Sequence, residues 1–164
     1  MENDMIRCAQ VLDLPVILEI YKRARAYMVE TGNPNQWGTT SPAQEMLEKD
    51  IEEQKLYVYV NEGEIRGVFF FDICEDPTYA YIEDGQWISD EPYGVIHRIA
   101  SSGVEKGVLG KCIDFCKQQT NHLRIDTHHD NKIMQHLVVK NGFERCGIIY
   151  IDDGSARIAY EYVK

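Results

Sequence analysis

The chain has 164 residues, a length that suits one core, and we expect residues 1–164 to form a single domain. Its 44% hydrophobic and 27% charged residues are ordinary for a globular protein, and no apolar run approaches the roughly 20 residues that span a bilayer. The formal net charge of −10 disfavours nucleic acid as a partner and would attract a cationic substrate, although an acidic surface also serves plain solubility.

The sequence shows neither a targeting segment nor a disulfide framework. Its first residues contain no basic segment followed by an apolar stretch, so we expect no signal peptide, no membrane partner and a cytoplasmic location. The five cysteines are odd in number and scattered, which favours reduced and mostly buried thiols.

The beginning of the chain predicts a strand followed by two helices. Residues 5–9 have the pattern of a short strand. Asp13 is expected to cap a helix whose apolar residues recur at helical spacing and which ends at Gly32. Ser41 and Gln44 have the spacing of a capping box, so a second helix is expected to start there.

The middle of the chain predicts strands. Residues 55–60 alternate between two faces, and residues 65–74 form a more apolar strand after a hairpin turn at 61–64. We expect a further short strand around 79–83 and another over 95–100.

The C-terminal half alternates helices and strands. In order, it predicts a helix over 108–120, a strand over 123–127, a helix from Asp130 or Asn131 to Gly142, and strands over 143–151 and 157–163. Without the short strand around 79–83, the order is β-α-α-β-β-β-α-β-α-β-β. It indicates an α/β protein of the mixed α+β kind, with a central mixed, mostly antiparallel sheet flanked by about four helices.

The segment from Val95 to Lys111 combines a strand, a glycine-rich turn and a helix start. A helix N-terminus offers free N–H groups and partial positive charge, and glycine lets the backbone approach a ligand, so the segment suits a pyrophosphate. Neither the G-x-G-x-x-G dinucleotide spacing nor the Gly-Lys-Ser/Thr of a Walker loop is present. Gly107 and Gly110 would equally suit a plain tight turn.

Three segments follow one another in the C-terminal half. They are His97-Arg-Ile-Ala100, Lys106-Gly-Val-Leu-Gly110 and Asn131-Lys-Ile-Met-Gln-His-Leu-Val-Val-Lys-Asn-Gly-Phe143. In order and spacing they resemble the GNAT family of N-acetyltransferases, and the N-terminal half fits that family in its pattern of elements. The resemblance implies the GNAT fold. It also implies transfer of an acetyl group from acetyl-CoA to a primary amine of a small molecule or peptide, by direct attack in a ternary complex.

The resemblance also implies where coenzyme A binds. In the family the pantetheine arm lies along the central strand like an added strand, and the pyrophosphate sits on the glycine turn. Asn131 falls on the family asparagine that contacts the cofactor arm. The other positions carried over or placed beside the phosphates are Ile99, Ala100, Ser101, Lys106, Gly107, Val108, Leu109, Gly110 and Lys111.

The sequence departs from the family pattern at three positions. Val104 and Leu109 replace a Gln/Arg and a second glycine of the turn, although Gly110 stands one residue further on. Phosphate binding through the backbone survives such changes. Val138 stands where many members have a tyrosine that protonates the leaving thiolate, so another group, water or unassisted departure would have to serve.

Four residues are candidates for proton transfer. An amine must be neutral to attack a thioester, so a base is needed, and backbone N–H groups of the central strand can stabilise the oxyanion. His97, on the central strand, is the first candidate base, and Asp72 and Asp126 are carboxylate candidates. Tyr150 could replace the missing acid. Each also has an ordinary structural explanation, as a packed ring or a strand-end charge.

The loop over residues 33–38 contains the expected acceptor contacts. In the GNAT fold this region borders the acceptor pocket, so Gln36 and Trp37 are expected to touch substrate, while Trp37 equally suits a cap over the core. Small amines, amino acids, antibiotics and protein N-termini all serve as acceptors in the family. Compact size and acidic charge favour a small cationic amine, and a homodimer is expected by resemblance alone.

Two other functions are open to the same sequence. A GNAT-like domain could bind acyl-CoA as a sensor or structural partner without efficient catalysis, which Val138 would favour. A nucleotide-binding module would bind nucleotide without coenzyme A, and the spacing from Val104 to Gly110 argues against it.

Metal and thiol chemistry are weaker interpretations. Cys112 and Cys116 lie four apart on the apolar face of a helix, so buried thiols explain them better than zinc, and we expect no metal. Cys146 has no adjacent histidine to activate it. A zinc site would also need histidine ligands, for which His122, His128 and His129 would be the candidates.

Overall fold

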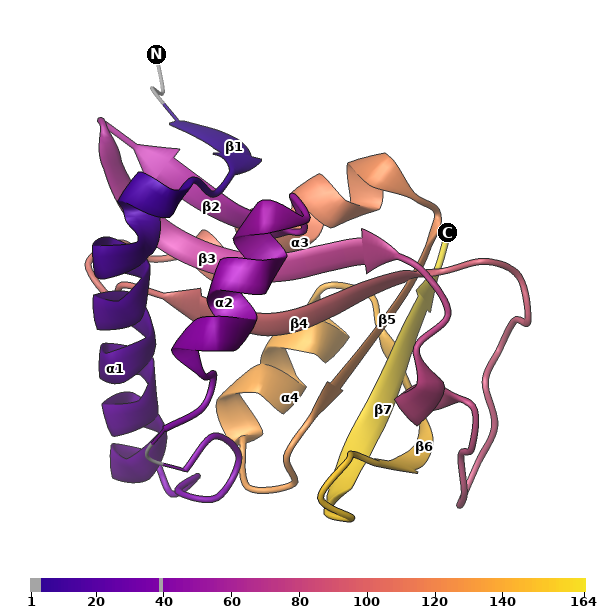
Figure 1. Cartoon of the computed structure of the whole chain (residues 1–164). Coiled ribbons are helices and arrows are strands. Elements are labelled where there is room, and N and C mark those ends of the chain that lie inside the picture. The colour runs from indigo at the N-terminus through magenta and orange to yellow at the C-terminus, as the bar shows by residue number, and fades with distance from the viewer. Residues whose placement is uncertain (1–3, 39) are drawn as a thin grey trace.

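The computed structural model describes residues 4–38 and 40–164. Within them, seven strands form one sheet in the order β1-β2-β3-β4-β5-β7-β6 (Figure 1). Neighbouring strands are antiparallel except β4 and β5, which are parallel. The strands are β1 (Asp4–Cys8), β2 (Leu56–Asn61), β3 (Glu64–Ile73), β4 (Gly94–Ser101), β5 (His122–Thr127), β6 (Glu144–Tyr150) and β7 (Ala156–Val163).

Four α-helices and two short 3-10 helices connect these strands in the described part of the chain. They are η1 (Val11–Asp13), α1 (Leu14–Glu30), α2 (Gln44–Glu52), η2 (Pro77–Tyr79), α3 (Val108–Gln119) and α4 (Lys132–Lys140). The order of strands and α-helices confirms the predicted fold class. Among the described residues, no helix combines the length and apolar character needed to cross a membrane.

Helices cover both faces of the sheet, and each face has its own core. On one face α1 and α2 bury Ile17 and Leu47 against β2 and β3. On the other face α3 and α4 pack behind the sheet in the view of Figure 1, with Val138 in their core. Val68 and Phe69, neighbours on β3, belong to these two different cores, as the alternation of a strand requires.

The strand predicted over residues 79–83 is not formed. Asp76 instead starts the 3-10 helix η2, because its carboxylate accepts a hydrogen bond from the Thr78 amide. Within the described residues, Glu83 alone of this segment pairs in a β-bridge, with Ile148. A side-chain cap therefore overrides the weak strand pattern.

The first two α-helices do not use the caps that the sequence suggested. α2 begins at Gln44 with Ala43 in the N-cap position, so Ser41 does not form the expected capping box. Asp13 occupies the N-cap of α1 but does not cap that helix: its carboxylate binds the Arg7 guanidinium at 2.7 Å and accepts a hydrogen bond from the Gln10 amide at the start of η1.

The central strand β4 carries a bulge. The register between β3 and β4 shifts near Arg98, so that β4 has one residue more than β3 over this span. Arg98 has φ of 52°, a conformation that side chains disfavour. Two contacts hold it there: the Tyr21 hydroxyl donates to the Arg98 carbonyl at 2.6 Å, and the Arg98 guanidinium pairs with Asp50.

Beyond its first residues, β4 parts from β5. The two strands pair only at Gly94 with Leu123 and at Val95 with Arg124 among the described residues. They then diverge, as Figure 1 shows. Residues 96–101 of β4 are therefore left without a strand partner on the β5 side in the part of the chain described here.

A buried ionic network fastens the loop before β4 to the neighbouring strands β5 and β7. Glu161 on β7 is fully buried and accepts hydrogen bonds from His122 and from Arg124 Nε, the latter at 2.9 Å. It also accepts one from the backbone amide of Ile88 in that loop. The Arg124 guanidinium lies 4.0 Å from the ring centroid of Trp87, in the same loop.

Candidate functional site

Two adjoining cavities lie where β4 and β5 part. The turn cavity, of about 490 Å³, is lined by residues 99–101 and by 107–110 at the glycine turn. The acidic cavity, of about 500 Å³, is lined by Asp76, Asp126, Asp152 and Asp153. The linings have four residues in common, so the two cavities lie side by side, and together we call them the groove. The shared residues are Met28, Ile99, Asn131 and Met134.

The turn cavity gathers most of the residues that the sequence assigned to coenzyme A. They are Ile99, Ala100, Ser101, Gly107, Val108, Leu109, Gly110 and Asn131. Gly107 is the N-cap of α3, with φ of 78°, and a Cβ placed there would meet no atom within 4 Å. The free N–H groups at this helix start therefore open onto the cavity, an arrangement that suits a phosphate.

Two lysines expected beside the phosphates lie elsewhere. Lys106 and Lys111 line neither cavity. Lys111 Nζ donates to Asp4 Oδ2 at 2.9 Å and to the Tyr59 hydroxyl at 3.0 Å, and the hydrogen bonds with Tyr59 and Asp4 raise the pKa of Lys111. Lys111 thus ties the first turn of α3 to β1 and β2.

Positive charge reaches the turn cavity from two other helices. Arg23 of α1 and Lys140 of α4 both line it. No local motif marks either residue, and α1 and α4 meet at the cavity only through the tertiary fold. Sequence reasoning had no signal by which to find them.

His97 on β4 lines the acidic cavity and is paired with Asp76 from the loop after β3. His97 Nε2 lies 2.7 Å from Asp76 Oδ2. A carboxylate only accepts, so in the neutral imidazole Nε2 carries the proton and Nδ1 can accept one. Burial raises the pKa of Asp76, but hydrogen bonds from His97 and Thr78 outweigh it and lower the pKa to about 2. The pair has the arrangement of a base with an orienting carboxylate.

Three further carboxylates line the acidic cavity. Asp126 on β5 accepts a hydrogen bond from the Tyr79 hydroxyl at 2.7 Å, and burial together with the Asp126 charge raises the pKa of Tyr79. Asp152 and Asp153 lie in the turn between β6 and β7. Arg157 on β7 is buried beside them; burial lowers its pKa, while attraction to Asp126 and Asp153 opposes that shift.

Gln36 joins the 33–38 loop to the start of α4. Its Oε1 accepts a hydrogen bond from Asn131 Nδ2 at 3.0 Å, and Asn131 Oδ1 in turn caps α4 by accepting from the Met134 amide. Trp37 lines the acidic cavity and packs edge-on against a buried ring of α1. The expected acceptor loop and the expected cofactor asparagine are therefore in direct contact.

Two of the catalytic candidates do not reach the groove. Asp72 Oδ2 lies 3.2 Å from Lys55 Nζ, and the Tyr150 hydroxyl donates to Glu83. Neither Asp72 nor Tyr150 lines either of the two cavities described here. Of the four candidates, the structure brings His97 and Asp126 together and leaves these two outside.

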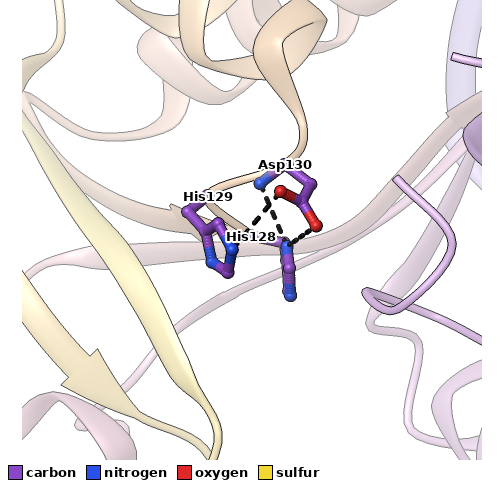
Figure 2. A group of neighbouring side chains, drawn as sticks. All are labelled: His128, His129 and Asp130. Carbon is purple, nitrogen blue, oxygen red and sulfur yellow. Dashed lines mark hydrogen bonds and ion pairs between the residues drawn. The ribbon is translucent and has the colours of Figure 1, made fainter. Parts of the chain in front are cut away.

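A cluster of His128, His129 and Asp130 precedes α4 (Figure 2). Their ligand atoms lie within 4.8 Å of one another, a spacing that a metal ion could bridge. Hydrogen bonding and ring stacking account for this close spacing without a metal ion. His128 Nδ1 accepts a hydrogen bond from the Asp130 amide at 3.1 Å, and the imidazole centroids of His128 and His129 are 4.3 Å apart. Burial, and then the nearby Arg157, lower the pKa of His128. None of the three lines either cavity.

Comparison with known proteins identifies the fold. No family model matches the chain, and no curated protein is significantly similar to it. An acetyltransferase of the GNAT family from Streptococcus agalactiae is 27% identical, with 98% of this chain and 95% of that chain covered and a TM-score of 0.90. The fold is that of the GNAT acetyltransferases.

More distant acetyltransferase structures have the same fold over the same length. A GNAT acetyltransferase from Listeria monocytogenes is 19% identical, with 98% of this chain and 95% of that chain covered and a TM-score of 0.72. Salmonella typhimurium yncA, solved with its cofactor acetyl-CoA, is 14% identical, with 98% and 93% covered and a TM-score of 0.61. The resemblance drawn from the three sequence segments is confirmed, and the GNAT fold implies acetyl-CoA-dependent acetylation.

Proposed function

We propose that the protein is an N-acetyltransferase that moves an acetyl group from acetyl-CoA to a primary amine of a small molecule. The observation that carries this proposal is that the turn cavity and the acidic cavity adjoin. Ile99 and Asn131 line both, so a thioester held at that end of the turn cavity would lie next to the cavity that contains the His97–Asp76 pair.

The residues of the turn cavity fit coenzyme A. The free edge of β4 at residues 99–101 offers backbone groups to the pantetheine amides, and the N–H groups at the start of α3 would hold the pyrophosphate. Arg23 and Lys140 would neutralise the remaining phosphate charge. When bound, acetyl-CoA supplies an acetyl thioester, whose carbon–sulfur bond breaks as the amine nitrogen bonds to the carbonyl carbon.

His97 would take the proton that the attacking amine loses. Nδ1 accepts it while Nε2 keeps its hydrogen bond to Asp76, whose negative charge stabilises the imidazolium. Asp76 acts through His97 and is a positioning residue. The proton reaches the departing thiolate from solvent, because a thiolate is weakly basic and Val138 offers no acid.

A domain that binds acyl-CoA without efficient catalysis is the second candidate. Val138, in place of the family tyrosine, is fully buried in the core and does not line the groove. Release of free thiol in the presence of a range of amines distinguishes the two candidates, since a sensor would bind the cofactor without turnover.

The first test is calorimetric binding of acetyl-CoA to the wild type and to Gly107→Trp. We expect micromolar binding by the wild type and at least about tenfold weaker binding by the variant, because the indole would occupy space that the pyrophosphate needs.

Gly63→Trp is the matched control for this experiment. Gly63 also has a positive φ, of 79°, and open space around its Cβ, but it lies in the β2–β3 turn outside the groove. It should bind like the wild type. Absence of acetyl-CoA binding by the wild type would contradict both the transferase and the sensor proposals. Equal binding by Gly107→Trp and the wild type would mean that the pyrophosphate does not bind at this turn.

A further inference from the structure

Arg157 on β7 is a buried cation that forms no ion pair within the described part of the chain. The residue is 5% exposed and lines the acidic cavity. Its guanidinium donates to uncharged oxygens, those of the Ser155 hydroxyl and of the Ala156 and Gln36 carbonyls. A buried charge is costly unless an opposite charge joins it, so this guanidinium suits an anionic group of a ligand.

The nearest carboxylates do not take that place. Burial lowers the pKa of Arg157, and attraction to Asp126 and Asp153 offsets this shift only in part. Each of these carboxylates has an uncharged partner of its own. Asp126 accepts a hydrogen bond from the Tyr79 hydroxyl at 2.7 Å, and Asp153 accepts one from the Ser155 amide at 2.8 Å. Their charges therefore act on Arg157 without occupying its donors.

Two of the five N–H groups of the Arg157 guanidinium have no partner among the described residues. Nη1 donates twice and Nη2 once, which leaves one N–H on Nη2 and the N–H on Nε. Nε is not among the buried polar atoms that lack a partner, so it is open to a ligand. Neighbouring N–H groups of a planar guanidinium can bind both oxygens of a carboxylate.

Gln36 adds a further donor at the same place. Its carbonyl accepts from Arg157 Nη2 at 3.2 Å, and the residue lines the acidic cavity. Its side-chain Oε1 accepts from four donors, namely Asn33 Nδ2, the Thr127 hydroxyl, the His128 amide and Asn131 Nδ2. An amide nitrogen in that position would oppose the His128 N–H, so the orientation of the side chain is fixed. Nε2 is the atom left over, and it has no described partner.

We propose that the acceptor is an amino acid, whose primary amine reacts beside His97 while Arg157 and Gln36 Nε2 hold its carboxylate. This assignment rests on the proposed acetyltransferase function and names its substrate class. His97, Gln36 and Arg157 all line the acidic cavity, so the amine and the carboxylate of one small molecule would share it. The net charge of −10 favours cations in general, whereas the buried guanidinium selects for an anionic group within this cavity.

The test is a panel of acceptors assayed with acetyl-CoA by release of free thiol. The panel contains α-, β-, γ- and longer ω-amino acids, the primary amide of each, and the n-alkylamine of matching length. Because an acid and its amide differ in the pKa of the amine, kcat/KM is referred to the concentration of neutral amine. We expect the best amino acid to exceed its own amide by at least about tenfold, since the amide lacks the charge that pairs with the guanidinium.

The outcomes separate the two proposals. Amides or alkylamines that react as well as the amino acids would overturn the amino-acid assignment and leave the transferase standing. Binding of acetyl-CoA without thiol release in the presence of any of these amines would overturn both proposals.

Two variants locate the recognition. Gln36→Glu keeps the accepting Oε1 but replaces the amide nitrogen with a negatively charged oxygen, so it should lower the acid-to-amide ratio of kcat/KM at least about threefold. Arg157→Lys keeps the charge but removes the planar pair of donors, and it should lower the ratio by at least about as much. The ratio is taken within each variant, so a smaller folded fraction does not affect it.

Gln118→Glu is the matched control. Gln118 is exposed on α3 and lines neither cavity, and its replacement adds the same negative charge as Gln36→Glu. It should keep the wild-type ratio. An equal fall in Gln118→Glu and Gln36→Glu would mean that overall charge sets the preference. A wild-type ratio in both Gln36→Glu and Arg157→Lys would mean that the carboxylate binds elsewhere, and either result would overturn the assignment to these residues.

Discussion

Replacing His97 with glutamine should lower kcat by about 10²- to 10⁴-fold, the contribution expected of a general base. Glutamine can still hydrogen-bond Asp76, which lies 2.7 Å from the imidazole, but it cannot accept a proton from the amine. Binding of acetyl-CoA should stay near the wild-type value, because His97 lines the acidic cavity and not the turn cavity. Steady-state thiol release and calorimetry give the two quantities.

The pH dependence distinguishes a base from a packed histidine. The loss of kcat in His97→Gln should become smaller as pH rises. The fraction of neutral amine then grows, so less of the substrate needs a base to remove its proton. Asp76 will not obscure this trend. Its pKa is lowered from 3.8 to about 2, so the stability that it contributes is present above 3.8 and is lost only as pH falls through 2.

His129→Gln is the control for this variant. It removes an exposed imidazole that lines neither cavity, and it should turn over like the wild type. A His97→Gln enzyme with kcat within about threefold of the wild type would rule out His97 as the base. Asp126, the other carboxylate that the structure keeps in the groove, would then be the candidate.

The fold could be predicted largely from local patterns, because those patterns are strong where the elements are long. The apolar stripes of α3 and α4 and the alternation of β2 required no knowledge of distant residues. The errors fall where a side chain has a partner other than the one expected. Asp76 capped a 3-10 turn in place of a strand, and Asp13 paired with Arg7 in place of capping α1.

The site could be predicted only as far as its motifs extend. Ile99, Gly107 and Asn131 belong to contiguous segments, and they line the groove. Asp76 stands 21 residues before His97, in a loop whose path the sequence does not specify. Lys111 was expected beside the phosphates because it is close to the glycine turn in sequence. Its side chain instead bonds Asp4, 107 positions away in the chain.

The bulge in β4 could not be seen in the sequence at all. Positive φ is signalled by glycine or asparagine, and Arg98 is neither. Its conformation is imposed by contacts with Tyr21 of α1 and Asp50 of α2, two elements far away in the chain. A strained residue held by two helices next to the reacting groups is a tertiary feature.

Replacing Glu161 with alanine should destabilise the fold by about 3–5 kcal/mol, the effect expected when one partner of a buried ion pair is removed. Arg124, which is 5% exposed, and His122 would lose the carboxylate that they share. The Ile88 amide would lose its acceptor as well, so the loop before β4 should loosen. Urea unfolding should show a lower midpoint at an unchanged slope.

The matched control lies directly opposite on the sheet. Glu144 on β6 pairs in register with Glu161 but is exposed, so Glu144→Ala should stay within about 0.5 kcal/mol of the wild type. Glu161→Gln, which keeps an acceptor but no charge, should fall between the two alanine variants. Equal stability of both alanine variants would contradict the ion-pair account. The guanidinium of Arg124 would then be stabilised by the rings of Trp87 and Tyr93, each 4.0 Å away, and Trp87→Leu would be the more damaging change.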